Sequence, residues 1–160
     1  MQVTIENEIK IIHLGNKGPN LLSLDRANEI ISELNKNDCK AVIILGNEKV
    51  FSAGLNLKHL QNAKKESEVA EIFTTLRELL VASRKFPGPV ISIVSGHAIA
   101  GGCLLALASD YRYGVHGMHR MGLNEMAIGI DLPPDMLSII SHNISKNYLF
   151  EVATQCRMYT

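Results

Sequence analysis

The stretch Val94–Asp110, VSGHAIAGGCLLALASD, decides the fold of this chain. An apolar run at Val90–Val94 breaks at Gly96, passes through small residues to Gly101 and Gly102, and resumes as an apolar run without a polar face. This order predicts a strand, a tight turn and a buried helix. The first N–H groups of such a helix have no intrahelical partner and lie at the positive end of its dipole.

Two interpretations of the glycines are open at this point. The turn suits an anion, or an oxygen that gains negative charge during a reaction. Alternatively, the glycines only allow the strand and the helix to pack closely. A P-loop is excluded because Cys103 and Leu104, and not Lys and Ser or Thr, follow Gly102. A dinucleotide fingerprint is excluded because the spacing is GxxxxGG and not GxGxxG.

Composition narrows the class of protein. The 160 residues are enough for one domain with a core, which we expect to span residues 1–160. Apolar residues make up 46% and charged residues 20%, and the formal net charge is zero. A nucleic-acid-binding protein needs a basic surplus or patch, and the longest run of basic residues here is the pair Lys64 and Lys65. We therefore expect no nucleic-acid partner.

The cysteines and the apolar runs bear on location. Cys39, Cys103 and Cys156 form no CxxC pair and have no metal-ligand spacing, which is typical of reduced thiols. Cys103 falls in the apolar helix, where a cysteine usually serves as a small core residue. The start, MQVTIENEIK, resembles neither a secretory leader nor an Arg-rich presequence, and no run reaches the length of a membrane span. These features predict a cytoplasmic protein with no membrane partner.

Hydrophobic periodicity predicts an α/β architecture of parallel strands joined by crossover helices. An N-terminal hairpin is followed by alternating helices and short apolar strands, and Val50–Leu60 is read as irregular. The C-terminal part holds two helical patterns that separate near Asn143–Ser145. The two strands of the expected hairpin are 2–5 and 8–14. The other expected strands are 41–45, 90–94 and 110–115. The expected helices are 23–36, 61–86 and the buried helix within 94–110.

A second loop of small residues favours the functional interpretation of the glycine turn. Phe51–Asn56, FSAGLN, follows the strand at Ala41–Leu45 much as the glycine turn follows Val90–Val94. Loops at the carboxyl ends of parallel strands gather at one edge of the sheet, so two sets of free N–H groups can face one pocket. Two converging donors form an oxyanion hole.

Glu125 is the candidate base. It lies among Met121, Leu123, Met126 and Ile128, and a glutamate in such a context is often an exposed loop residue. If it is buried instead, its charged form is disfavoured and its pKa moves toward that of a base working near neutral pH.

At these residues the chain resembles the crotonase, or enoyl-CoA hydratase/isomerase, superfamily. The similarity rests on Phe51–Lys58, FSAGLNLK, together with Gly96–Asp110, GHAIAGGCLLALASD, and extends over essentially the whole chain. It implies a ββα spiral fold, acyl-CoA thioester ligands and an oxyanion hole. Coenzyme A would then be part of the substrate, and we expect no separate cofactor.

The resemblance also implies the roles of individual residues. The oxyanion donors would be the backbone N–H groups of Leu55 and Gly101. The coenzyme A site would include the main chain around the second loop, with a lysine near the nucleotide part. The residues matched to this coenzyme A site are Ser52, Ala53, Gly54, Leu57 and Lys58.

The acid and base positions predict which reaction of the superfamily applies. Hydratases of this family use two glutamates, and the position of the first is Leu104 in this chain, whereas the second is Glu125. Hydration needs one group to hold the water and another to deliver a proton, and Leu104 can do neither. The combination GGCLLALASDYR with GLNE resembles enoyl-CoA isomerases with one glutamate, in which a single base moves a proton while the hole holds the enolate oxygen.

The predicted function is therefore isomerisation of a 3-enoyl-CoA to a trans-2-enoyl-CoA with Glu125 as the proton shuttle. The alternatives are a non-catalytic acyl-CoA-binding or assembly protein, and another reaction of the superfamily such as hydration. Family members usually continue past the position of Thr160 with helices that cover the acyl pocket and pack in a trimer or a hexamer. We therefore expect a homo-oligomer in which the C-terminal part of the family fold is absent.

Other polar residues receive structural interpretations. His97 is predicted to pack or to form hydrogen bonds, and Asp110 with Arg112 to form a pair or a cap at the end of the helix. His116 and His119 have no third ligand nearby in the sequence, so no metal is expected. Asn56 stands where many family members have Asp, and no proton transfer is assigned to it.

Overall fold

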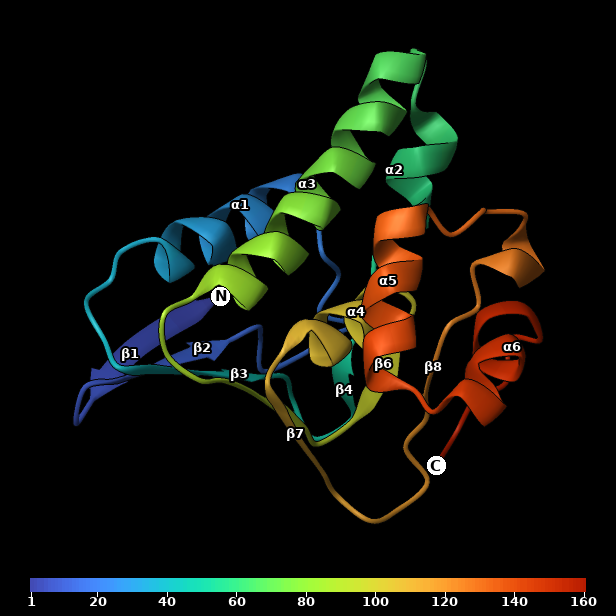
Figure 1. The fold of residues 1–160 in the computed structure, drawn as a ribbon. Coiled ribbons are helices and arrows are strands. Elements are labelled where there is room, and N and C mark those ends of the chain that lie inside the picture. The colour runs from blue at the N-terminus through green and yellow to red at the C-terminus, as the bar shows by residue number, and fades with distance from the viewer.

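The computed structural model describes residues 1–160, and their strands form two sheets (Figure 1). The larger sheet has five strands in the order β1-β2-β3-β5-β7, and the smaller has three in the order β4-β6-β8. The five strands of the larger sheet are β1 (Gln2–Glu6), β2 (Ile9–His13), β3 (Ala41–Leu45), β5 (Val90–Val94) and β7 (Tyr111–Gly114). The smaller sheet consists of β4 (Val50–Ser52), β6 (His97–Ile99) and β8 (Met121–Gly122).

The pairing in the larger sheet agrees with the prediction from sequence. β1 and β2 form the antiparallel hairpin, and β2, β3, β5 and β7 run parallel to one another. Ile11, Ile43, Ile91 and Tyr111 occupy one row across four adjacent strands. The strands at 41–45 and 90–94 are confirmed with the predicted bounds, and that at 110–115 is slightly shorter.

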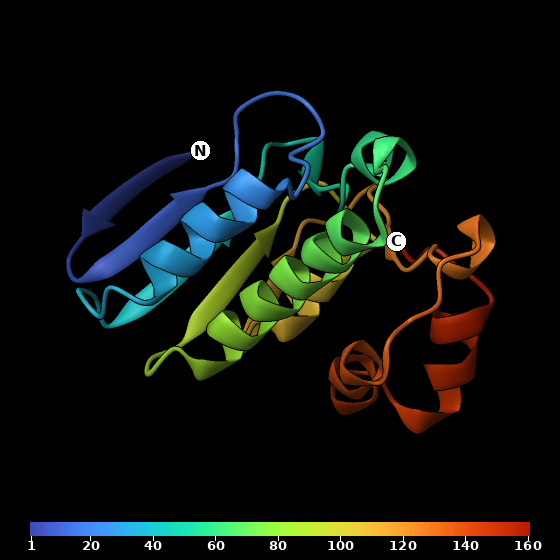
Figure 2. The same ribbon diagram turned by 90° about the horizontal axis from the view of Figure 1, so that it is seen from above.

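Two helices cover one face of the larger sheet: α1 (Leu24–Leu34) and α3 (Glu66–Lys85) lie side by side across it (Figure 2). α1 begins after Ser23, whose hydroxyl accepts a hydrogen bond from the N–H of Arg26 at 3.3 Å, as expected for an N-cap. Ala27, Ile30 and Leu34 form the buried face of this helix. α3 ends before Pro87, in agreement with the sequence.

The predicted helix at 61–86 is wrong at its N-terminal end. The chain forms a short helix α2 (Leu57–Asn62), becomes extended at Ala63 and Lys65, and then begins α3. The side chain of Glu68 accepts a hydrogen bond from the N–H of Lys64 at 2.9 Å and satisfies a donor at this break. Hydrophobic periodicity does not locate this break, because Ala63 is the only apolar residue in 61–68.

The second sheet was not predicted. β4 lies in the segment read as irregular, and β6 lies in the segment read as a simple turn. Three residues are too few to show an alternating pattern, so the pairing of β4, β6 and β8 depends on segments far apart in the sequence. This small sheet brings the two predicted loops together.

The buried helix and the C-terminal helices were predicted correctly. Every residue of α4 (Gly101–Ala108) is buried, and the core cluster contains 26 buried apolar residues. A single 3₁₀ turn η1 (Met126–Ile128) precedes α5 (Pro134–Asn143) and α6 (Lys146–Thr154), with the break near the predicted position. None of these helices combines the length and the apolar character needed to cross a membrane.

Candidate active site

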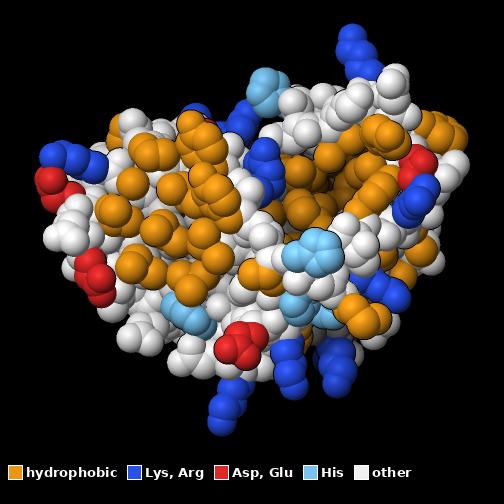
Figure 3. All heavy atoms as spheres, turned by 90° about the horizontal axis from the view of Figure 1, so that it is seen from below, with side chains coloured by type: hydrophobic (Ala, Val, Ile, Leu, Met, Phe, Trp, Pro, Cys, Tyr) orange, Lys and Arg blue, Asp and Glu red, His pale blue; other side chains and the backbone are white.

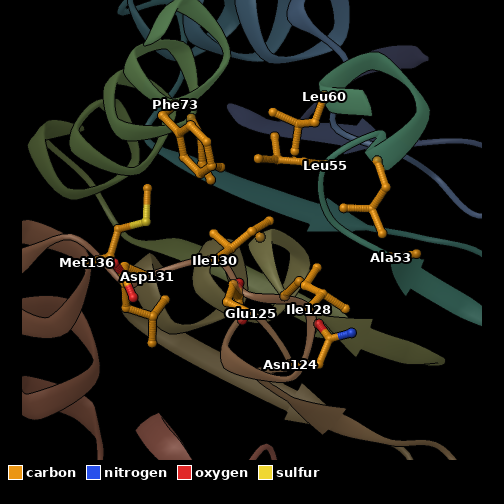
Figure 4. Close-up of a pocket in the computed structure, with 15 residues that line it drawn as sticks. Ala53, Leu55, Leu60, Phe73, Asn124, Glu125, Ile128, Ile130, Asp131 and Met136 are labelled. Carbon is orange, nitrogen blue, oxygen red and sulfur yellow. The ribbon is translucent and has the colours of Figure 1, made fainter. Parts of the chain in front are cut away.

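A cavity of about 60 Å³ lies where α3, α5, the second loop and the N-terminus of α4 meet, and Figure 4 shows its labelled lining residues. Most of the lining is apolar. The predicted site residues among the lining are Ala53, Leu55, Leu57, Gly101 and Glu125. The remaining lining residues are Leu60, Phe73, Leu76, Ala100, Asn124, Ile128, Ile130, Asp131, Leu132 and Met136.

The two predicted oxyanion donors are neighbours in space. Leu55 lies outside helices and strands, and its N–H donates to no backbone carbonyl of the chain. Gly101 is the first residue of α4, where an N–H has no intrahelical acceptor. A Cβ on Gly101 would lie 3.6 Å from the Leu55 nitrogen, and a Cβ on Gly54 would lie 2.8 Å from the Gly101 nitrogen. Gly54 has φ +80°, so the loop needs glycine there both for conformation and for space.

Ala100, which precedes Gly101, has an unusual backbone conformation. Its φ of 52° and ψ of −126° are disfavoured for a residue with a Cβ. The surrounding hydrogen bonds impose it: the Ala100 N–H donates to the Gly122 carbonyl at 3.0 Å, and the Ala100 carbonyl accepts from the Leu104 N–H at 3.0 Å. The strained residue therefore lies directly at the proposed anion site.

Glu125 is buried, in agreement with the second of its two interpretations. Glu125 is 8% exposed, and its Oε2 has no hydrogen-bond partner. Burial raises the pKa of this carboxyl, and hydrogen bonds from its own backbone and from that of Asn124 only partly oppose the increase. In Figure 4 it lies between Ile130 and Ile128 at the cavity. A carboxyl whose charged form is disfavoured in this way is a stronger base than an exposed glutamate.

Ser52 acts inside the protein as a support of the second loop. Its side chain is fully buried, and its hydroxyl donates to the Asn20 carbonyl at 2.8 Å and accepts from the Gly54 N–H at 3.1 Å. A Cβ on Gly102 would lie 2.2 Å from the Ser52 carbonyl oxygen. Gly102 therefore allows the close packing of β4 and α4, and the anion-binding role of Gly101 stays a prediction.

Lys58, which is also matched to the coenzyme A site, does not line the cavity. Lys58 is exposed in the first turn of α2. Its N–H donates to the Asn56 Oδ1 at 3.1 Å, so Asn56 caps this helix. The exposed side chain of Lys58 is available to a charged group outside the apolar pocket.

α4 carries two side chains that the sequence analysis singled out. Leu104 is fully buried and does not line the cavity. Cys103 is also buried, and burial raises the pKa of its thiol to about 12. Such a thiol is inert as a nucleophile and serves as a core residue, as predicted.

The other polar residues have structural contacts. The Nδ1 of His97 accepts a hydrogen bond from the Arg120 N–H at 2.9 Å, as predicted for a hydrogen-bonding residue. Asp110 accepts from the Val90 N–H at 2.8 Å, and Arg112 donates to three carbonyls at the end of α4, the shortest bond being 2.6 Å to Ser109. Arg112 is thus a cap, and it forms no ion pair with Asp110. No group of three or more His, Cys, Asp or Glu side chains is placed to hold a metal ion.

Two polar residues of the cavity were missed in the sequence. Asp131 lines the cavity but is exposed, and the buried Oδ1 of Asn124 has no hydrogen-bond partner. Asp131 belongs to no motif, and Asn124 was quoted only as part of GLNE; the fold of the loop after β8 brings both to the same cavity as Glu125. Asn124 is adjacent to the base in the sequence, which was the one available signal.

Comparison with known proteins agrees with this geometry. The family described as enoyl-CoA hydratase/isomerase matches residues 4–160. Enoyl-CoA delta isomerase 1 of Rattus norvegicus, a mitochondrial protein, is 34% identical over 143 residues, which cover 82% of this chain and 49% of that protein. A probable enoyl-CoA hydratase of Bacillus subtilis is 26% identical over 134 residues, which cover 81% of this chain and 52% of the relative.

Solved structures have the same fold. A probable enoyl-CoA hydratase of Mycobacterium tuberculosis, EchA3, superposes with a TM-score of 0.90 at 25% identity, over 99% of this chain and 67% of that one. The human enoyl-CoA hydratase domain-containing protein 3 superposes with a TM-score of 0.87 at 25% identity, over 99% of this chain and 64% of that one. The chain spans between about a quarter and a half of the length of the curated relatives it matches. The family match and the shared fold show that this chain belongs to the enoyl-CoA hydratase/isomerase family of the crotonase superfamily.

Proposed function

We propose that this protein isomerises a 3-enoyl-CoA to a trans-2-enoyl-CoA. The observation that carries the proposal is that Glu125 is the one buried carboxylate at a cavity that also exposes the backbone of Leu55 and Gly101. The position of the other hydratase glutamate, the first of the two, is the apolar, fully buried Leu104. One base and one anion site suffice to move a double bond.

The reaction follows from these groups. The thioester oxygen accepts hydrogen bonds from the N–H groups of Leu55 and Gly101, and the N-terminus of α4 adds its dipole. Glu125 removes a proton from C2; the C2–H electrons form a C1=C2 bond, and the carbonyl π electrons move to the thioester oxygen, which gives a dienolate that keeps its C3=C4 bond. The same carboxyl then returns the proton to C4. When C4 is protonated, the C3=C4 electrons form the new C4–H bond, the C1=C2 electrons form C2=C3, and the oxygen restores the carbonyl. No water enters the product, and the apolar lining limits access of water to the enolate.

The acyl group is expected to be aliphatic. The cavity of about 60 Å³ is small, but it shares Leu60, Phe73, Ile130 and Asp131 with an adjoining groove of about 380 Å³ that reaches Val69 and Pro133. An extended hydrocarbon chain can follow this groove away from the thioester. The exposed Lys58 is available to the phosphates of coenzyme A outside it.

The test is to mix the protein with a 3-enoyl-CoA and to follow the conjugated thioester in the ultraviolet. A signal that depends on enzyme concentration and is lost in Glu125→Gln is expected, because general base catalysis contributes about 10²- to 10⁴-fold to a rate. Exposed Glu29 offers a control, and Glu29→Gln is expected to retain the wild-type rate. Equal rates for Glu125→Gln and wild type would contradict the proposal.

Asp131 supports a second candidate, which is hydration of a 2-enoyl-CoA. It is another carboxylate at the cavity and could hold a water molecule that Glu125 activates. Loss of the conjugated absorbance when the protein is mixed with a 2-enoyl-CoA would favour hydration, and sensitivity of that loss to Asp131→Asn would assign the water. Binding of the acyl-CoA in calorimetry without any turnover would instead favour a non-catalytic acyl-CoA-binding protein.

A further inference from the structure

Two grooves adjoin the cavity, and Met136 stands between the cavity and one of them. On the side of α2, the cavity shares Leu60, Phe73, Ile130 and Asp131 with the groove of about 380 Å³ described above, called here the first groove. On the side of α5, the cavity shares one residue, Met136, with a groove of about 220 Å³ between α3 and α5, called here the second groove. The cavity is thus continuous with the first groove along several residues and meets the second at a single side chain.

The residues of α3 show how the cavity and the second groove are arranged. Phe73 and Leu76 line the cavity, whereas Leu80 lines the second groove. Leu76 and Leu80 are four residues apart, so they lie on the same face of α3 at a rise of about 6 Å. Met136 is 2% exposed, and in Figure 4 its side chain extends from α5 toward Phe73. This side chain therefore forms the wall between the cavity and the second groove.

The end of α5 that carries Met136 is held against α3. The Nε of Arg77 on α3 donates to Asp135 Oδ2 in a salt bridge, and both residues line the second groove. Asp135 Oδ1 accepts a hydrogen bond from the Met136 N–H at 3.0 Å. Pro134 begins α5, at a position where its fixed φ suits a helix. These contacts fix the backbone of Met136, while its thioether side chain fills the gap between the two helices.

A larger apolar pocket is separate from the cavity. The face shown in Figure 3 is hollowed on its right, where a pocket of about 480 Å³ lies against Cys103 and Leu107 of α4. This pocket shares no lining residue with the cavity or with either groove. An acyl chain that leaves the thioester therefore follows the first groove, and the nearest space for a branch of that chain is the one that the Met136 side chain occupies.

We propose that Met136 makes the protein selective for unbranched acyl chains. This selectivity rests on the proposed isomerisation of an acyl-CoA and specifies the class of acyl group that the site takes. A straight chain enters the first groove without contact with the second. A branch close to the reacting carbons has to displace the Met136 side chain, because the cavity of about 60 Å³ is closed by it on that side. Met136→Ala removes the thioether and joins the cavity to the second groove.

The test compares 3-hexenoyl-CoA with the branched 5-methyl-3-hexenoyl-CoA in the ultraviolet assay. A single methyl group in an apolar pocket changes kcat/KM by about 10- to 200-fold, so the wild type is expected to prefer the straight substrate at least tenfold. Met136→Ala is expected to reduce this preference to about threefold or less, and Met136→Leu, which conserves volume, is expected to keep it. An unchanged preference in Met136→Ala would overturn the proposal, as would a wild type without a preference.

The matched control for the loss of a core side chain is Ile140→Ala. Ile140 lies one turn after Met136 on α5, is fully buried, and lines neither the cavity nor the grooves. Both variants lose a buried side chain and are expected to lose stability, but Ile140→Ala is expected to keep the wild-type preference. Loss of the preference in both variants would show a general loosening of α5 and would overturn the proposal. Circular dichroism checks folding, and Met136→Val, a smaller truncation, tests the same loss of preference if Met136→Ala is unfolded.

Binding measurements distinguish the role of Met136 from the proposed reaction. Calorimetry with hexanoyl-CoA and 5-methylhexanoyl-CoA, which are saturated, needs no turnover. A wild type without isomerase activity that binds hexanoyl-CoA at least tenfold more tightly, with the difference lost in Met136→Ala, would contradict the proposed function and support the role of Met136. Equal binding of the two esters by an inactive wild type would overturn both.

Discussion

Lys10 and Glu125 are both charged residues buried in this protein, and their surroundings are opposite. Lys10 is fully buried, and its Nζ lies 2.7 Å from Asp38 Oδ1, 3.1 Å from Glu33 Oε2 and 2.6 Å from the Glu33 carbonyl oxygen. Burial alone would lower the pKa of Lys10, but the hydrogen bonds to Asp38 and Glu33 outweigh it and raise that pKa. Glu125 has an Oε2 with no partner, and burial raises its pKa.

The difference distinguishes a charge that stabilises the fold, at Lys10, from a charge proposed to react, at Glu125. Every Lys10 contact stabilises the ammonium ion, which therefore holds β2 to the end of α1. No counter-ion stabilises the Glu125 carboxylate, so its charged form is costly and its proton can be exchanged with a substrate. Lys10 should thus matter to stability, and Glu125 to activity at the expense of stability.

The largest expected effect on stability comes from breaking the Lys10 cluster. Lys10→Met removes the cation between Glu33 and Asp38 and leaves Glu33 with Lys36 as its remaining partner. Because the side chains of Glu33 and Asp38 are 17% and 39% exposed, the cost is below that of a fully buried pair, about 2 kcal/mol. Urea unfolding at neutral pH measures it. Lys40→Met is the matched control, because the Lys40–Glu8 pair is exposed and should contribute little. Similar midpoints for Lys10→Met and wild type would show that the cluster is not stabilising.

At Glu125, a substitution is expected to increase the stability of the fold. Glu125→Gln should stabilise the fold by about 1 to 2 kcal/mol at pH 7, because a neutral amide replaces a buried, unpaired charge. The folded state binds a proton more tightly than the unfolded state, so this gain should shrink as the pH falls through the raised pKa of Glu125 toward the ordinary glutamate value of 4.5, and should be nearly absent below 4.5. Unfolding curves at pH 7 and pH 4 test both statements, and a gain independent of pH would contradict the role of the charge.

A smaller effect is expected from Ala100. Ala100→Gly relieves a backbone conformation that costs about 1 to 3 kcal/mol, partly offset by the greater entropy of an unfolded glycine. A net stabilisation of about 1 kcal/mol, or an increase in Tm of about 2 to 4 °C, is expected in calorimetry. Ala106→Gly in the middle of α4 is the control and should be destabilising. A lower Tm for Ala100→Gly would show that Ala100 is not strained.

The pH dependence of the isomerisation rate tests the role of Glu125 separately from its effect on stability. If Glu125 is the base, kcat/KM for a 3-enoyl-CoA should rise with pH as the carboxyl loses its proton, with an apparent pKa above 4.5. Stopped-flow ultraviolet traces from pH 4 to pH 8 measure it. An activity that is flat across this range and declines only below pH 4.5 would assign an unperturbed carboxylate.

The local patterns predicted the larger sheet well because its elements are locally consistent. Continuous apolar runs such as Ala41–Leu45 have the composition of buried parallel strands, and the α1 stripe has the spacing of a helix packed on a sheet. The predicted oxyanion residues Leu55 and Gly101 lie together at one cavity with Glu125. Their positions followed from the family motifs, since neither glycine loop by itself distinguished a binding site from close packing.

What the sequence by itself determined is the identity of the elements and of the family, because hydrophobic period and glycine spacing are local properties of the chain. Only the tertiary structure decided which polar groups are buried and which are paired. The sequence contains Lys10 and Glu125 in similarly apolar surroundings, IKII and NEMAI. The fold brings Asp38 and Glu33 to the first and no partner to the Oε2 of the second. Burial and pairing depend on contacts between distant segments, and those contacts separate the structural charge from the proposed catalytic base.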